Sequence, residues 1–332
     1  MFRVTFPGGA VVPRPDPTAT AGQLLARYLH DQAAEFLRSL RTYSEGDEEA
    51  ARALRRSARR ISGTLHTFRG HLDAAWADQL RSELAWLSGT LAREHAYAAR
   101  LARLLEALGR LSDGTASLPG PRDGTGRPAA LAMGAARAGA LLERQLTLAR
   151  TRAHSAALQA LGSSRFHAVA DAVALLASDV PFAPAATTYA TETLPPAAET
   201  AGRRLADAVA ALPLHRAAHP YNAEGLSDAQ DAPWHQVRLL LRLHRYAQEA
   251  LTAGLDDRPG PDLRLYGAGQ ALDQHREAAE AAGAAASAAR TPRIAPATAY
   301  ALGVLHADQR HEVEAARYTF QQAWQRTAVS AP

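Results

Sequence analysis

Two short segments place arginine at the spacing of a single helix face. The first is RALRRSARR at 52–60, and on a helix its arginines fall within about 140° of arc: Arg52, Arg55, Arg56, Arg59 and Arg60. The opposite side of that helix is apolar and carries Leu54, Ala58, Ile61, Leu65 and Phe68. Like charges three and four residues apart repel each other, and no acid stands within the segment. A solvated surface is the alternative, but stability alone rarely selects this pattern, whereas an anionic ligand would explain it.

The segment WHQVRLLLRLHRYAQE at 234–249 repeats this device in the second half of the chain. Within about 80° of arc on a helix it gathers His235, Arg238, Arg242, Arg245 and Glu249. A salt-bridged helix surface would also account for the pattern. Because the two segments occupy matching places in two similar halves, we favour one shared binding surface over two unrelated ones.

The composition excludes several kinds of chemistry. The chain has no cysteine, which excludes disulfides and thiolate catalysis. Its 37 basic residues are all arginine, which excludes Schiff-base and P-loop lysines. HExxH and paired Glu-x-x-His motifs are absent, so we expect no metal site and no cofactor. A Ser-His-Asp triad stays open, but there is no G-x-S-x-G elbow, and we assign no catalytic residue.

Alanine content and apolar spacing predict an all-helical protein. The chain holds 78 alanines among 332 residues, and alanine is the strongest helix former, while β-branched and aromatic residues are scarce. Apolar residues recur at helical spacing between breaks rich in Gly, Pro and acidic residues. A first helix begins at Thr18 or Thr20, loops are predicted at 180–196 and 219–233, and further helices at about 47–70, 73–92, 94–112, 129–161, 164–178, 197–212, 230–253, 262–288 and 297–328.

Breaks in the helical pattern also divide the chain. We expect an irregular arm at 1–17, a first helical half at 18–112, a linker with four Gly and three Pro at 113–128, and a second half at 129–328. The net charge of +4 is unevenly divided, because residues 1–160 hold 22 arginines and 15 acids, a charge of +7, while residues 161–332 carry a charge of −3. No run of 18 apolar residues and no signal sequence is present, so we expect a cytoplasmic protein without membrane contact.

The two arginine segments resemble the basic helices of the CHAD domain, a helical family named for conserved histidines. The first family helix reads approximately H-x-x-R-V-x-x-R-R-L-R-x-x-L-x-x-F, and residues 52–68 match at Arg55, Arg59, Arg60, Ile61, Leu65 and Phe68. The second reads approximately H-x-L-R-I-x-x-K-R-L-R-Y-x-x-E, and residues 235–249 match at His235, Val237, Arg238, Leu239, Arg242, Arg245, Tyr246 and Glu249. The chain departs from the pattern where Arg52 replaces the first histidine and where Asp273 replaces a later glycine.

The resemblance covers about 18–328 as one CHAD domain and implies a fold and a ligand. The implied fold is all-α, with two similar antiparallel four-helix bundles related by a pseudo-two-fold axis, plus additional helices. The implied function is non-catalytic binding of inorganic polyphosphate in a central Arg-rich cleft, with targeting to polyphosphate granules as a further expectation. The alternative is a helical scaffold or nucleic-acid-associated protein that has lost polyphosphate binding. Another polyanion is a possible partner, and nucleic acid ranks behind polyphosphate.

The expected binding residues come from both basic helices. They are Arg52, Arg55, Arg56, Arg59, Arg60, His235, Arg238, Arg242 and Arg245. A second group of candidates is Arg144, Arg150, Arg152 and Tyr246. For its three arginines, a position on the exposed surface without any binding role is an equally good explanation.

Overall fold

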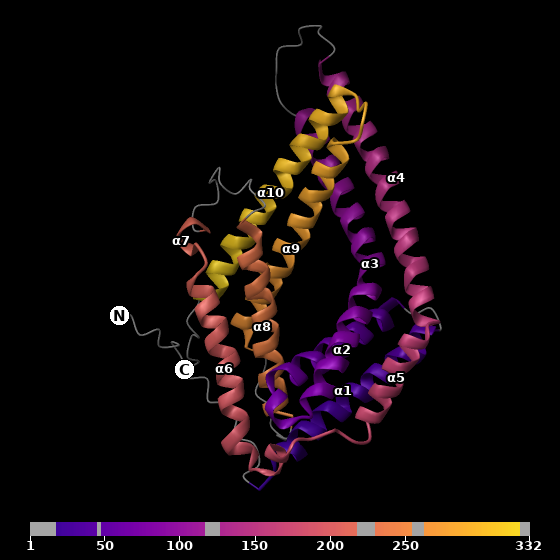
Figure 1. Cartoon of the computed structure of the whole chain (residues 1–332). Helices are drawn as coiled ribbons and strands as arrows, with labels where there is room; N and C mark the ends of the chain where they lie inside the picture. Colours follow the sequence, from indigo (N-terminus) through magenta and orange to yellow (C-terminus); the bar gives the residue numbers. More distant parts are fainter. Residues whose placement is uncertain (1–17, 45–47, 117–126, 218–229, 254–261, 326–332) are drawn as a thin grey trace.

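The computed structural model describes residues 18–44, 48–116, 127–217, 230–253 and 262–325, and Figure 1 shows their arrangement. Within these residues the chain forms α-helices and short 3-10 turns, with two isolated β-bridges and no strand. The prediction of an all-α fold is therefore confirmed. None of the described helices is both long enough and apolar enough to cross a membrane.

The helices follow one another along the chain with short connections. Their bounds are α1 Ala21–Ser44, α2 Glu48–Thr67, α3 Ala74–Ala116, α4 Arg127–Leu161, α5 Ser164–Leu176, α6 Ala190–Ala210, α7 Leu214–Ala217, α8 Asp231–Leu251, α9 Leu263–Ala289 and α10 Pro296–Gln325. The 3-10 turns are η1 Arg69–His71 and η2 Pro184–Thr187.

Two expectations about helix boundaries are wrong. The helices predicted at 73–92 and 94–112 form one continuous helix, α3. No Pro or Gly stands at 92–94, so nothing in the local sequence interrupts the backbone hydrogen bonds there. The loop predicted at 180–196 ends earlier, because α6 begins at Ala190 and contains Pro195 and Pro196. The burial of Leu194 and Ala198 on the same helix shows that tertiary packing outweighs the unfavourable prolines.

Several predicted boundaries lie largely outside the described residues. The arm at 1–17 is outside them altogether. Of the linker at 113–128, the first residues belong to α3, the last belong to α4, and 117–126 lie outside the description. Most of the loop at 219–233 also lies outside, and α8 begins at Asp231. The division into two halves related by a pseudo-two-fold axis stays a prediction.

Four apolar clusters hold the helices together. One joins α1, α2, α5, the first part of α3 and the end of α4. A second joins α6, α7, α8, the start of α9 and the end of α10. A third lies where the long helices α3, α4, α9 and α10 meet, at the end of the molecule away from α1 and α2 (Figure 1). The fourth cluster joins α1 to α6 and α8, and so connects the parts of the chain that carry the two basic helices.

The N-terminal ends of α1 and α6 are tied to each other directly. The Ala21 N–H donates to the Thr188 carbonyl at 2.8 Å, and the Ala190 N–H donates to the Ala19 carbonyl at 2.9 Å. Each bond satisfies one of the N–H groups that the first turn of a helix leaves without an intrahelical partner. This reciprocal pair fixes the ends of the two helices against which α2 and α8 pack.

Candidate functional site

The basic helices α2 and α8 contact each other directly. The sequence patterns predict one buried side for α2, and the structure buries it: Leu54, Ala58, Ile61 and Leu65 of α2 and Phe68 just after its end are each at most 1% exposed. The contact with α8 is close at Gly63, where a Cβ atom would lie only 2.6 Å from the Tyr246 ring. Glycine at this position therefore lets the two helix backbones approach.

An ion pair also joins α2 and α8 where the two helices cross. Arg60 Nε of α2 donates to Glu249 Oε2 of α8 at 2.6 Å, and the Arg60 guanidinium lies 5.9 Å from the centre of the Tyr246 ring. The Tyr28 hydroxyl of α1 donates to the same carboxylate at 3.1 Å. Burial and the charge of Glu249 raise the pKa of Tyr28, so this hydroxyl keeps its proton and remains a donor.

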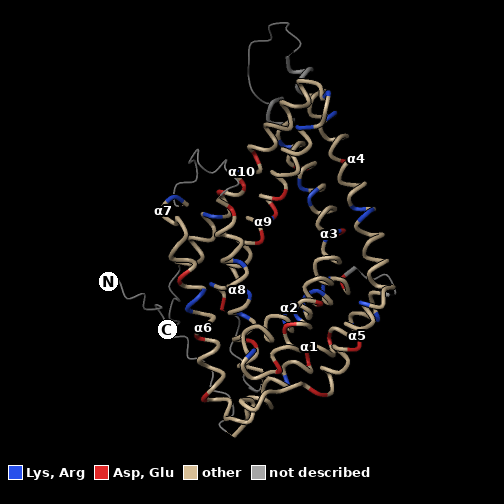
Figure 2. The backbone as a smooth tube through the Cα atoms, viewed as in Figure 1, with Lys and Arg blue, Asp and Glu red and all other residues tan. Residues whose placement is uncertain are grey.

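Five arginines from three helices gather beside this crossing, and we refer to them as the arginine cluster. They are Arg55 and Arg59 of α2, Arg238 and Arg242 of α8, and Arg276 of α9. Figure 2 shows basic positions on both α2 and α8 where these helices approach.

Burial and mutual repulsion lower the pKa of two members of the arginine cluster. Burial, followed by the charges of Arg59, Arg276, Arg242 and Arg238, lowers the pKa of Arg55 to about 10. Burial and the charges of Arg238 and Arg59 lower the pKa of Arg242 to about 10, against the opposite effect of Asp273. Both groups stay charged at neutral pH. The arginine cluster is thus a partly desolvated concentration of positive charge.

The members of the arginine cluster differ in their anionic partners. Arg238 Nε and Arg242 Nη2 both donate to Asp273 Oδ1 of α9, at 2.6 and 2.9 Å. Arg55 and Arg59 have no carboxylate partner among the described residues, and the Nε atom of each is buried without a hydrogen bond. A partly buried guanidinium without a carboxylate partner carries a desolvation cost, which an incoming anion would relieve.

Arg276 of α9 is paired and partly buried. Its Nη1 donates to Glu280 Oε1 at 2.8 Å, and Arg100 of α3 donates to the other oxygen of that carboxylate at 2.6 Å. Burial opposes ionisation of Glu280, but the charge and hydrogen bonds of these arginines hold its pKa below the usual range. α9 therefore brings both positive and negative charge to the arginine cluster.

Four other predicted binding residues of α2 and α8 make contacts of their own. Arg52 and Arg56 both pair with Glu49, at 2.9 Å each, and Arg245 lies 4.0 Å from Glu249. His235 is exposed, with its ring edge-on to the buried His275 at 5.6 Å.

The three candidate arginines on α4 are placed differently. Arg150 lies 3.7 Å from Glu94 of α3. Arg144 and Arg152 are exposed, and no described contact joins either residue to the arginine cluster. Their part in binding remains a prediction.

Sequence patterns alone missed two residues of the arginine cluster region, Asp273 and Arg276. Both lie in the α9 segment ALDQHREA at 271–278, which resembles a family motif in which Asp273 occupies a glycine position. That substitution was the available signal. Its consequence depends on the packing of α9 against α8, because Asp273 and Arg238 are 35 residues apart in the chain.

A buried ion network fixes the start of α8. Asp231 accepts two hydrogen bonds from Arg310, at 2.7 and 3.0 Å, and one from Arg317 at 2.7 Å. Arg317 also donates to Glu314 at 2.6 Å, and Arg310 is only 1% exposed. Burial alone would raise the pKa of Asp231, but hydrogen bonds from His275 and Arg310 bring it well below its usual range. The network therefore anchors α8 to α10.

The described residues contain no group of three His, Asp or Glu side chains arranged to hold a metal ion. The chemistry that the arginine cluster offers is charge and directed N–H donors. Guanidinium groups present N–H pairs that match two oxygens of one phosphate or carboxylate. Facing arginine-bearing helices on an all-α fold thus define a protein suited to holding an extended anion.

Comparisons with known proteins agree with this fold. The family model for the CHAD domain matches residues 27–286, so the chain belongs to the CHAD domain family. Among solved structures, the chain is similar to "PptA from Streptomyces chartreusis", with 63% sequence identity and a TM-score of 0.78. The similarity covers 93% of this chain and 100% of that one. No curated protein matches the chain.

Proposed function

We propose that the chain binds inorganic polyphosphate, without catalysis, at the arginine cluster between α2, α8 and α9. The observation that carries the proposal is the pair Arg55 and Arg59, which are partly buried beside three further arginines and have no described carboxylate partner. A chain of phosphates would place negative charge against each guanidinium in turn. Family membership supports the same ligand, and targeting to polyphosphate granules would follow from the same binding.

The proposed ligand fits the arrangement better than duplex DNA does. The five arginines come from three helices around one crossing, so they form a compact group instead of a line along one exposed helix. A flexible single chain of phosphates can bend around such a group, whereas duplex DNA is stiff and is read by elements placed in a groove. DNA therefore serves as the competitor in the test.

A titration with polyphosphate at two salt concentrations tests the proposal. Affinity should fall as salt rises, because binding releases counterions from the polyanion. Replacing Arg55, Arg59, Arg238 and Arg242 together by Ala should weaken binding by at least about 3 kcal/mol if each contributes near 1. Helicity should persist, since alanine favours helix.

A charge-matched control distinguishes this site from general attraction. The control replaces four exposed arginines outside the arginine cluster by Ala: Arg38, Arg110, Arg137 and Arg203. It loses the same charge and should bind nearly as well as the parent protein. Equal weakening of both variants, or absence of binding by the parent at low salt, would favour the helical scaffold alternative. Stronger binding of duplex DNA than of polyphosphate would favour a nucleic-acid partner.

A further inference from the structure

A pocket of about 840 Å³ lies next to the arginine cluster, between α1, α2, α3, α4 and α5. Its volume is in the range typical of small-molecule sites, about 300–1,000 Å³. One wall is apolar and consists of Leu37, Leu40, Leu91, Leu158, Leu161 and Phe166. A phosphate chain without carbon has no favourable contact to make with this wall, so the site proposed above does not account for it.

The exposure of Leu158 marks the apolar wall as accessible. Leu158 lines the pocket from α4 with 55% of its surface exposed, although the neighbouring Ala157 and Leu161 pack into the first apolar cluster. A leucine exposed inside a concave surface gains most when an apolar group covers it. The wall can therefore receive an apolar body.

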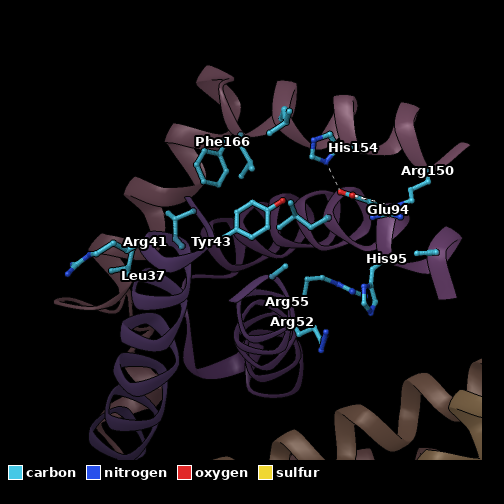
Figure 3. A pocket seen from close by; sticks show the side chains of 16 residues that line it. Leu37, Arg41, Tyr43, Arg52, Arg55, Glu94, His95, Arg150, His154 and Phe166 are labelled. Carbon is cyan, nitrogen blue, oxygen red and sulfur yellow. Dashed lines mark hydrogen bonds and ion pairs between the residues drawn. The ribbon is translucent and has the colours of Figure 1, made fainter. Parts of the chain in front are cut away.

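The opposite side of the pocket is cationic. Arg52 and Arg55 of α2 line it, and Figure 3 shows Arg55 extending toward His95 of α3. The Nε atom of Arg55 is buried without a hydrogen-bond partner. Arg55 therefore belongs both to this pocket and to the arginine cluster.

The acidic group in the pocket is already paired. Glu94 Oε2 lies 2.9 Å from His154 Nδ1, and Arg150 lies 3.7 Å from the other oxygen (Figure 3). The Tyr43 side chain also lines the pocket, and burial followed by the charge of Glu94 raises its pKa, so it remains a neutral donor. The carboxylate thus leaves the charge at the α2 side of the pocket positive.

We propose that this pocket binds a small organic phosphate, with its apolar body against the leucines and Phe166 and its phosphate at Arg52 and Arg55. The leucines and Phe166 offer apolar contact, and the two arginines offer charge and N–H donors. An organic phosphate needs both kinds of contact. Two sources share this chemistry, an alkyl phosphate of lipid type and a nucleotide. The proposal does not depend on polyphosphate binding.

A fluorescent probe with the same two-part chemistry tests the pocket. 8-Anilinonaphthalene-1-sulfonate carries an aromatic body and an anionic group, and it should bind the full chain at one saturable site. Octyl phosphate or adenosine monophosphate should displace it, and whichever displaces it at lower concentration identifies the source. Inorganic phosphate and octanol each offer one half of the contact, and each should be at least about tenfold weaker. Displacement by inorganic phosphate as strong as by both organic phosphates would overturn the proposal.

Two exposed leucines of α4 give a matched pair of variants. Leu158→Glu places a negative charge in the apolar wall and should weaken displacement by the organic phosphate at least about tenfold. Leu148→Glu makes the same change at a position that is 49% exposed and does not line the pocket, and it should bind like the parent. If Leu158→Glu does not fold by circular dichroism, Leu158→Gln and Leu148→Gln make a matched pair in which a neutral polar group replaces the leucine.

Arginine variants separate the two proposed sites. Arg55→Ala should weaken both the organic phosphate and polyphosphate, whereas Arg59→Ala, outside the pocket, should weaken polyphosphate alone. Unchanged organic phosphate binding in both Leu158→Glu and Arg55→Ala would exclude the pocket and leave the polyphosphate proposal intact. Loss of polyphosphate binding in Leu158→Glu would contradict the separation of the two sites.

Discussion

On α2, Arg55 and Arg59 reach the arginine cluster without a described carboxylate partner, whereas on α8, Arg238 and Arg242 share the carboxylate of Asp273. The two helices thus present similar cationic faces in different electrostatic states. On α2 the charges of Arg55 and Arg59 are not offset by any carboxylate among the described residues, so a ligand or solvent can offset them. On α8 the single carboxylate of Asp273 offsets part of the charge of Arg238 and Arg242, and it holds both guanidiniums in place before any ligand arrives.

The two helices are also fixed in different ways. α2 is held by a buried, mainly apolar face and a close crossing at Gly63. α8 is held in addition by the buried network around Asp231 at its first turn. We therefore expect α2 to supply most of the affinity for an anion, while α8 and α9 hold their arginines in a fixed position around it.

The largest effect on stability is expected from disrupting the buried ion network that anchors α8. Asp231→Ala removes the carboxylate shared by two buried guanidiniums, Arg310 and Arg317, and should lower the free energy of unfolding by about 3–5 kcal/mol. Urea unfolding followed by circular dichroism measures it. Asp171→Ala, at an exposed position of α5, is the control and should change stability by less than about 0.5 kcal/mol. Equal stability of the two variants would mean that the network does not hold α8.

The next effect tests the two arginine faces at equal loss of charge. Arg55→Ala removes one positive charge from α2, and the triple change Arg238→Ala, Arg242→Ala and Asp273→Ala removes one net positive charge from α8 and α9. Arg55→Ala should weaken polyphosphate binding by at least about 1 kcal/mol, as for the loss of one hydrogen bond. The triple variant should lose less, because Asp273 already compensates part of the charge of its two arginines. Isothermal titration of both variants decides, and a greater loss in the triple variant would reverse the comparison.

Acid should destabilise the protein through histidines whose pKa is lowered by burial. Burial lowers the pKa of four histidines, His66 and His71 near the end of α2, His244 in α8 and His275 in α9. Unfolded histidines take up protons near pH 6.5 and these native ones resist it, so stability should be lost as pH falls below that value. Urea midpoints at pH 8 and pH 5.5 measure the loss.

Two asparagine variants assign that pH dependence. His275→Asn should flatten the decline, whereas His167→Asn, at an exposed position of α5, should leave it unchanged. Asp231 adds a separate decline at lower pH, since its depressed pKa makes its contribution disappear as pH falls below about 3.8. A parent protein equally stable at pH 8 and pH 5.5 would contradict the prediction.

How far the sequence predicts this molecule depends on the range of each interaction. The apolar face of α2 follows from periodicity within one helix, and every residue assigned to it is buried. The continuity of α3 was missed because short bundle helices were expected, although no residue near Ala92 breaks a helix. Arg310 and Arg317 would be expected at the surface by residue type, and they are buried because Asp231 and Glu314 pair with them.

The candidate site shows the same limit more sharply. Each arginine face can be predicted from the spacing within its own helix. Whether each arginine has a carboxylate partner cannot be predicted in this way. Glu49 lies close in the sequence to the arginines that it binds, while Asp273 reaches Arg238 only through the packing of α9 against α8. The difference between the two faces is therefore a property of tertiary structure, even though one residue, Asp273, creates it.

The smallest expected effect comes from removing that one residue's charge. Asp273→Asn keeps the shape of the side chain and an oxygen that can accept from Arg238 and Arg242, but removes the negative charge from the arginine cluster. The side chain is 44% exposed, so the pair is worth about 0.2–1 kcal/mol, and polyphosphate binding should tighten by up to about fivefold. Titration at low salt measures it, with Asp179→Asn at an exposed position as the charge-matched control.

The direction of this change decides what Asp273 does. Burial opposes its ionisation, yet the charges of Arg238 and Arg242 lower its pKa, so it is ionised at neutral pH and competes with a phosphate for both arginines. If competition dominates, Asp273→Asn binds more tightly, and the gain persists in the Arg55→Ala background because it arises on α8. If Asp273 instead positions the two guanidiniums, the variant binds more weakly, and α8 would then depend on its carboxylate as a frame for the ligand.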